Sequence, residues 1–113
     1  MRPVAILGIG QTQIGEHWDK SLREIGGEAA FAAMHDAGVE TVDALFVGNM
    51  LSSTISGQNQ LGAFFSDWIG LWKQEAVKVE AACASGAAAL RAGLMAVPAG
   101  ALDAAHPAGV DKA

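Results

Sequence analysis

The chain alternates between short apolar runs and longer segments whose apolar residues recur every three or four positions. Residues 4–10 and 42–49 are mostly apolar, and residues 76–80 repeat the pattern more briefly. Runs of this kind are typical of strands that are buried on both faces of a parallel sheet. We therefore expect three strands, separated by helices.

The first helix is predicted over residues 21–37. Ser21 and Glu24 have the spacing of a capping box, which satisfies free backbone N–H groups at a helix start, and Gly38 is a natural residue to end the helix. Near that end, His35 is expected on the surface. The apolar residues that predict one buried face of this helix are Leu22, Ile25, Ala29, Ala33 and Ala37.

Two further helices are expected. The helix at residues 58–68 follows a loop at residues 50–57, and its core candidates are Leu61, Phe64 and Phe65. Trp68 and Trp72 are predicted to be packing residues and not parts of a cofactor site.

The helix at residues 84–97 is ended by Pro98 and consists almost entirely of small residues, with Arg91 as its one charge. Small residues on all sides allow close approach of neighbouring elements, so we expect this helix to be buried.

This alternation predicts an α/β fold with a mostly parallel sheet. The 113 residues suffice for one small domain, residues 1–113. Near the end of the chain, His106 and Pro107 interrupt what would be a fourth strand. Because proline cannot donate a hydrogen bond to a neighbouring strand, this strand is expected to be weak or to lie at an edge.

Charge and composition exclude several classes of function. The net charge is −5, and no basic patch or polybasic run points to nucleic acid or a membrane surface. No stretch approaches the roughly 18 apolar residues of a membrane helix. One cysteine cannot form an intrachain disulfide, which suits a cytoplasmic protein. No Cys, His and Asp cluster has metal-ligand spacing, and Gly8 and Gly10 lack the third glycine of a dinucleotide fingerprint.

Cys83 is the candidate nucleophile. It lies between the third predicted strand and the helix at residues 84–97, so its thiol is expected at or near a helix N-terminus. There the unpaired N–H groups and the helix dipole favour negative charge, and the thiolate is the nucleophilic form of cysteine. The alternative role for a lone cysteine among alanines is that of a small buried hydrophobe.

Residues 80–90, Glu-Ala-Ala-Cys-Ala-Ser-Gly-Ala-Ala-Ala-Leu, resemble the nucleophile segment of the thiolase superfamily. The similarity is greatest to acetyl-CoA acetyltransferases and sterol-carrier-protein-type thiolases. The strand at residues 4–10, Asn49 and the Gly-Val-Asp-Lys sequence at 109–112 extend the resemblance across the chain. It implies the N-terminal half of a thiolase-like layered fold, a partial domain without the last strand of that half.

The resemblance also implies a reaction. Cys83 would form an acyl-enzyme thioester during Claisen condensation or thiolysis of 3-oxoacyl-CoA, with a coenzyme A thioester as substrate and no separate cofactor or metal. The family's second cysteine and its catalytic histidine belong to the second half, so this chain is not expected to turn over alone. Its expected partners are a second copy, as a homodimer, or a complementing C-terminal half.

His106 stands in the sequence Ala-His-Pro-Ala-Gly, which is similar to the family's Gly-His-Pro motif. It falls in the fourth strand, so we do not expect it to be the catalytic base. His17 lies in the loop at residues 11–20 and matches no motif.

Two other functions remain open at this point. The chain could be a non-catalytic thiolase-like module that binds acyl-CoA, lipid or a partner protein. It could also be a segment of a ketoacyl synthase or a hydroxymethylglutaryl-CoA synthase, which place a cysteine at a helix start as well. The sequence Ala82-Cys83-Ala84-Ser85-Gly86 fits thiolase better.

Overall fold

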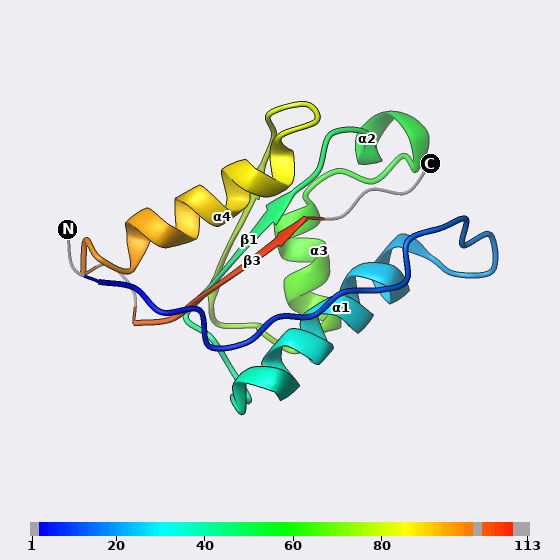
Figure 1. Cartoon of the computed structure of the whole chain (residues 1–113). Helices are drawn as coiled ribbons and strands as arrows, with labels where there is room; N and C mark the ends of the chain where they lie inside the picture. The colour runs from blue at the N-terminus through cyan, green and yellow to red at the C-terminus, as the bar shows by residue number, and fades with distance from the viewer. Residues whose placement is uncertain (1–2, 101–102, 110–113) are drawn as a thin grey trace.

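The computed structural model describes residues 3–100 and 103–109. Within these residues, three parallel strands form one sheet in the order β2-β1-β3: β1 (Ala44–Gly48), β2 (Glu75–Val79) and β3 (Ala105–Gly109). Figure 1 shows α4 (Ser85–Ala96) on one face of the sheet, with α1 (Leu22–Ala37) and α3 (Leu61–Trp68) on the other. The predicted α/β fold with a parallel sheet is confirmed.

Strand β1 is the centre of the molecule, and all five of its residues are buried. Leu45 and Val47 belong to the apolar core formed with α1 and α3, whereas Ala44 and Phe46 pack with Ala89 of α4. Successive side chains of a strand point to opposite faces, so a strand covered by helices on both faces must be apolar at every position. This is why the run at residues 42–49 lacks a polar alternation.

Helix α1 begins and ends as predicted. The Ser21 hydroxyl accepts a hydrogen bond from the Glu24 backbone N–H at 3.2 Å, and Gly38 follows the helix with a left-handed φ of 69°. Leu22 and Ile25 are buried, which confirms part of the predicted face. The other buried positions are Gly27, Ala30 and Met34.

The expected strand at residues 4–10 is wrong. This segment has no regular structure, and the Ile6, Leu7 and Ile9 side chains are between 66% and 75% exposed. It runs against α1 instead (Figure 1). Gly8 and Gly10 allow this close approach, since a Cβ on either residue would overlap the α1 backbone. The two edges of β1 are already paired with β2 and β3, which leaves this segment no position beside β1.

The predicted face of α1 is corrected by the same contact. Ala29, Ala33 and Ala37 are only half-buried. Their backbone lies along the path of Gly8 and Gly10. The small side chains therefore make room for a neighbouring backbone and not for the main core.

The segment between β1 and β2 contains one helix that the sequence did not predict, α2 (Ser52–Ile55), within the expected loop. Leu61 and Phe65 of α3 are buried and Phe64 packs against them, as predicted. The Arg23 guanidinium lies over the Phe64 and Trp68 rings, 4.5 and 5.1 Å from their centroids, and joins α1 to α3.

The two tryptophans differ from each other. Trp68 is 44% exposed, but its indole lies where a Cβ on Gly27 would be, so it packs on α1 along one side. Trp72 is 78% exposed, and its indole N–H donates to the Asp67 carbonyl at 3.2 Å. The packing role predicted for Trp72 is therefore wrong.

The prediction that the helix after Cys83 is buried is also wrong for this chain. Only Ser85, Ala89 and Gly93 of α4 are buried, all on the side that meets the sheet. On the outer side, Leu90 is 40% and Met95 51% exposed. The small residues permit burial on several sides, but the described part of the chain supplies a neighbour on only one.

Strand β3 lies at an edge of the sheet, as the proline predicted. Pro107 stands opposite Phe46 in the parallel register. The Asp43 carboxylate accepts hydrogen bonds from the backbone N–H groups of Asp103 and Ala104, both at 3.0 Å, and so anchors the start of β3. The rest of the Gly-Val-Asp-Lys match, residues 110–112, lies outside the described residues. Among the helices that are described, none is long and apolar enough to cross a membrane.

Three glycines set the distance between the sheet and the start of α4. A Cβ on Gly48 would overlap the Ser85 carbonyl group and lie 2.8 Å from the Gly86 nitrogen. A Cβ on Gly109 would lie 3.1 Å from the Gly86 Cα. The first turn of α4 therefore rests directly on the backbone at the ends of β1 and β3.

We predict that Gly48→Ala destabilises the fold by about 1–3 kcal/mol, because the added methyl meets rigid backbone and not a flexible side chain. Urea unfolding followed by circular dichroism measures the change. Gly15→Ala is the matched control, since nothing lies within 4 Å of a Cβ at that position. Equal stability of the two variants would contradict the close contact.

Candidate active site

The candidate site lies at the carboxyl edge of the sheet. The three strands are parallel, so their carboxyl ends meet at one edge, where ligands of open α/β sheets commonly bind. Cys83 follows the end of β2 at this edge, in the loop that leads into α4 (Figure 1). Its thiol is free and exposed. The predicted placement of Cys83 beside a helix start is confirmed. The alternative, that Cys83 is a small buried hydrophobe, is wrong because its side chain is exposed.

The loop is a pair of overlapping tight turns. The Ala84 N–H donates to the Ala81 carbonyl at 2.9 Å, and the Ser85 N–H donates to the Ala82 carbonyl at 3.1 Å. Ala82 has a positive φ of 49°, a conformation that costs a residue with a Cβ about 1–2 kcal/mol. Cys83 is therefore the residue that follows a strained position, on a turn that projects its side chain into solvent.

The start of α4 has no side-chain cap, because Ala84 stands at the N-cap position. The first-turn N–H groups of a helix carry partial positive charge, which favours an anion placed beside them. Such an environment supports negative charge that develops on a reacting group beside the helix start. The nearest charges in sequence, Lys78 and Glu80, pair with each other at 4.0 Å.

Within the described residues, no side chain forms a hydrogen bond with the Cys83 thiol. His17 is hydrogen-bonded to the Gln13 carbonyl oxygen at 2.6 Å, and His35 lies exposed in the last turn of α1, as predicted for a surface histidine. His106 stands opposite Leu45 in the backbone register, so its predicted position inside a strand is confirmed. Neither His17 nor His35 joins Cys83 as a base.

The described part of the chain also contains no group of three His, Cys, Asp or Glu side chains that could hold a metal ion.

Two polar residues at this edge belong to the segments that resemble the family, but the sequence analysis gave neither of them a structural role. Asn49, fully buried, accepts a hydrogen bond from the Ser52 N–H at 2.9 Å and so begins α2. Ser85, 2% exposed, bonds to the backbone of the turn before Cys83. The role of Asn49 had a signal in the sequence, because an asparagine often accepts a hydrogen bond from a backbone N–H at a helix start. The role of Ser85 had none, because Ser85 lies inside the predicted helix.

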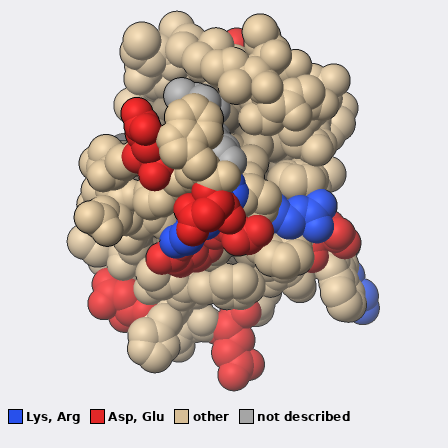
Figure 2. Space-filling view, turned by 90° about the vertical axis from the view of Figure 1, so that its right-hand side faces the viewer, with Lys and Arg blue, Asp and Glu red and all other residues tan. Residues whose placement is uncertain are grey.

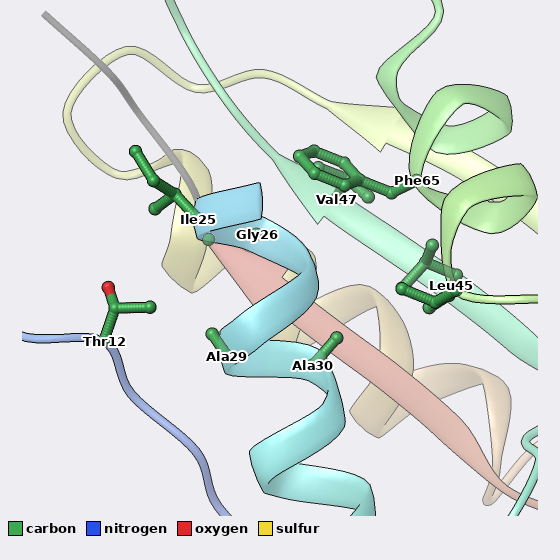
Figure 3. Close-up of a pocket in the computed structure, with 10 residues that line it drawn as sticks. Thr12, Ile25, Gly26, Ala29, Ala30, Leu45, Val47 and Phe65 are labelled. Carbon is green, nitrogen blue, oxygen red and sulfur yellow. The ribbon is translucent and has the colours of Figure 1, made fainter. Parts of the chain in front are cut away.

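A cavity of about 130 Å³ lies away from Cys83, between α1, the sheet and the N-terminal segment (Figure 3). Ile25, Leu45, Val47 and Phe65 line it, and Thr12 closes one side. Ligand sites usually measure about 300–1,000 Å³. This cavity is therefore a gap in apolar packing and not a substrate site.

Charged side chains avoid one part of the surface. On the face drawn in Figure 2, acidic and basic groups gather in the middle and lower parts, whereas the upper part is almost bare of charge. The upper end of the molecule holds α2 and the loop before α4 (Figure 1). No extended basic surface appears on this face.

Cys83 thus lies on a tight turn between a parallel strand and a helix. Residues 4–112 match the family described as thiolase, N-terminal domain. The chain therefore belongs to the thiolase N-terminal domain family, as the sequence predicted.

Curated relatives extend the match. The chain is 46% identical over 114 aligned positions to an acetyl-CoA acetyltransferase of Methanothermobacter thermautotrophicus, and 40% identical to that of Methanocaldococcus jannaschii. Each alignment covers 99% of this chain but only 30% and 29% of the relatives. The chain thus spans about a third of the length of these relatives.

Solved structures share the fold. The 3-oxoacyl-(acyl carrier protein) synthase III, FabH, of Pseudomonas aeruginosa PAO1 superposes with a TM-score of 0.66 at 24% identity, over 77% of this chain and 26% of the synthase. The corresponding synthase III of Aquifex aeolicus VF5 gives 0.65 at 14% identity, over 84% and 31%. The thiolase-like fold predicted from the sequence is confirmed.

We predict that iodoacetamide at neutral pH modifies the folded chain once, at Cys83, at a rate close to that of the chain unfolded in urea, because the thiol is exposed. Intact mass against time measures both rates, and Cys83→Ser is the control that takes no label. Labelling that requires unfolding would show instead that the thiol is buried.

Proposed function

We propose that this chain is the N-terminal segment of a thiolase-type acyltransferase, in which Cys83 accepts the acyl group of an acyl-CoA thioester. The observation that carries the proposal is the exposed thiol on a strained turn at the start of α4, within a segment that belongs to the thiolase N-terminal domain family. The relatives at 46% and 40% identity are named acetyl-CoA acetyltransferases, which favours an acetyl group.

The first chemical step is a thioester exchange. The Cys83 thiolate attacks the carbonyl carbon of the acyl-CoA, and the negative charge develops on the carbonyl oxygen. As the intermediate collapses, the bond to the coenzyme A sulfur breaks and coenzyme A leaves as a thiolate. The products are an acyl-Cys83 thioester and coenzyme A, which then takes up a proton. The uncapped first turn of α4 supports the developing negative charge.

The second step, carbon–carbon bond formation or cleavage, needs groups to move the α-proton. This sequence has one cysteine, and no described histidine bonds to it. Catalytic groups that act as a unit lose most of their effect when one is missing. We therefore propose that the chain accepts an acyl group alone but completes a cycle only with further residues of a thiolase.

Those residues would come from a complementing C-terminal segment. The outer face of α4 is the place where it would pack, since Leu90, Leu94 and Met95 are 36% to 51% exposed there. An exposed apolar helix face is a usual mark of an interaction surface. A second copy of this chain, bound through the same face as a homodimer, is the alternative partner. We also propose that the protein is located in the cytoplasm.

The folds of the 3-oxoacyl-(acyl carrier protein) synthases III favour a second candidate, a segment of a 3-oxoacyl synthase, which would also begin with an acyl-Cys83 thioester. The acceptor of the acyl group separates the two candidates. A completed thiolase would pass the group to a second acyl-CoA, whereas the name of the synthases indicates a 3-oxoacyl product on an acyl carrier protein. The non-catalytic module is the third candidate, and it predicts no covalent adduct.

We predict that incubation with acetyl-CoA adds a single acetyl group to the chain, because thioester exchange needs only an accessible thiolate and stabilisation of the oxyanion. Intact mass spectrometry measures the adduct, and peptide mapping places it on Cys83.

The matched control is Cys83→Ser, which replaces the thiol with a hydroxyl of similar size and should carry no acetyl group. A folded wild-type chain without any adduct would contradict the proposal and favour the non-catalytic module.

A further inference from the structure

The Ser85 side chain spans the turn that carries Cys83. Its hydroxyl oxygen accepts a hydrogen bond from the Ala81 N–H at 2.9 Å, and its O–H donates to the Ala82 carbonyl at 2.6 Å. Ser85 is the first residue of α4, yet its hydroxyl does not cap that helix. It instead joins the two residues before Cys83 to the residue two positions after it.

Ala82, one of the two residues so held, is in the left-handed region with a φ of 49°. The left-handed region is unfavourable for alanine, because its Cβ crowds the backbone. A residue stays in this conformation only when surrounding contacts enforce it. The Ala82 carbonyl accepts hydrogen bonds from both the Ser85 hydroxyl and the Ser85 N–H. These two bonds are the contacts that hold the Ala82 peptide in its strained orientation.

Ser85 is itself held by the sheet. It is 2% exposed, and its carbonyl group lies against Gly48 at the end of β1, where no side chain would fit. The hydroxyl therefore links the turn to a residue that packs on the central strand of the sheet. Cys83, between the strained Ala82 and the fixed Ser85, is left little freedom although its own side chain is exposed.

We propose that Ser85 is a positioning residue for Cys83: its hydroxyl holds Ala82 at positive φ and thereby places the thiol beside the start of α4. This inference rests on the proposed function, since it concerns the acylation of Cys83. Loss of the hydroxyl leaves the Ala81 N–H without its acceptor and removes one of the two hydrogen bonds to the Ala82 carbonyl. Ala82 then relaxes toward negative φ, and Cys83 leaves the position in which the helix start stabilises negative charge.

The experiment compares Ser85→Ala with wild type in the 113-residue chain. Acetylation of Cys83 by acetyl-CoA is followed by intact mass, and exchange of the Ala81 amide is followed by NMR. We expect Ser85→Ala to slow acetylation on the order of tenfold, as the loss of a partly buried hydrogen bond implies. We also expect faster exchange of the Ala81 amide. Ser53→Ala, which truncates an exposed serine of α2, should change neither rate.

A second variant separates positioning from general destabilisation. Glycine adopts positive φ without steric cost. In Ala82→Gly/Ser85→Ala, the turn no longer needs the hydroxyl to overcome strain, so acetylation should recover to within roughly threefold of wild type. A loss of activity through partial unfolding would not be rescued by replacing Ala82 with glycine, and thermal melts of each variant check the folded fraction.

The outcomes are distinct. A slow Ser85→Ala with a recovered double variant supports the proposal. Wild-type acetylation by Ser85→Ala, or a double variant as slow as the single one, overturns it. If wild type itself takes no acetyl group, the proposed function fails, and exchange of the Ala81 amide then tests the Ser85 hydrogen bonds alone. Faster exchange in Ser85→Ala supports them as the contacts that hold the turn, and unchanged exchange overturns that role.

Discussion

The first turn of α4 rests on the bare backbone at the ends of β1 and β3, with Gly48, Gly86 and Gly109 at the contact. No side chain separates the helix from the strands, so the helix start cannot shift without breaking backbone packing. Ser85, whose carbonyl lies against Gly48, carries this constraint into the preceding turn through its hydroxyl. The position of Cys83 is thus fixed by the sheet, although its thiol faces solvent.

This arrangement would meet two opposing demands on the nucleophile that we propose Cys83 to be. The thiol must be accessible to a large thioester, and it must also lie in a defined place relative to groups that stabilise charge. The tight turns at residues 81–85 make the thiol accessible. The strained Ala82 and the packed start of α4 hold Cys83 in a defined position. Half-exposed Leu90 and Met95 on the far side of α4 show that the described chain covers this helix on one side only.

Sequence reasoning succeeded where local pattern decides structure. The capping pair Ser21 and Glu24 determines the start of α1 through contacts within four residues. The alternation of apolar runs with helical segments then gives the α/β fold. The segment at residues 4–10 has the same apolar pattern as β1, but pairing depends on which strand edges are free. Burial of α4 depends likewise on what lies beside it. The positive φ of Ala82 had no sequence signal, because glycine is the usual marker of that conformation.

The central claim is that this chain acts as the nucleophile-bearing segment of a thiolase. The most direct test replaces the aligned segment of the Methanothermobacter acetyl-CoA acetyltransferase with this chain and measures acetoacetyl-CoA thiolysis by the chimera. The account predicts a folded chimera with thiolysis activity that disappears in its Cys83→Ala form. A folded chimera without activity, or activity that survives Cys83→Ala, would contradict it.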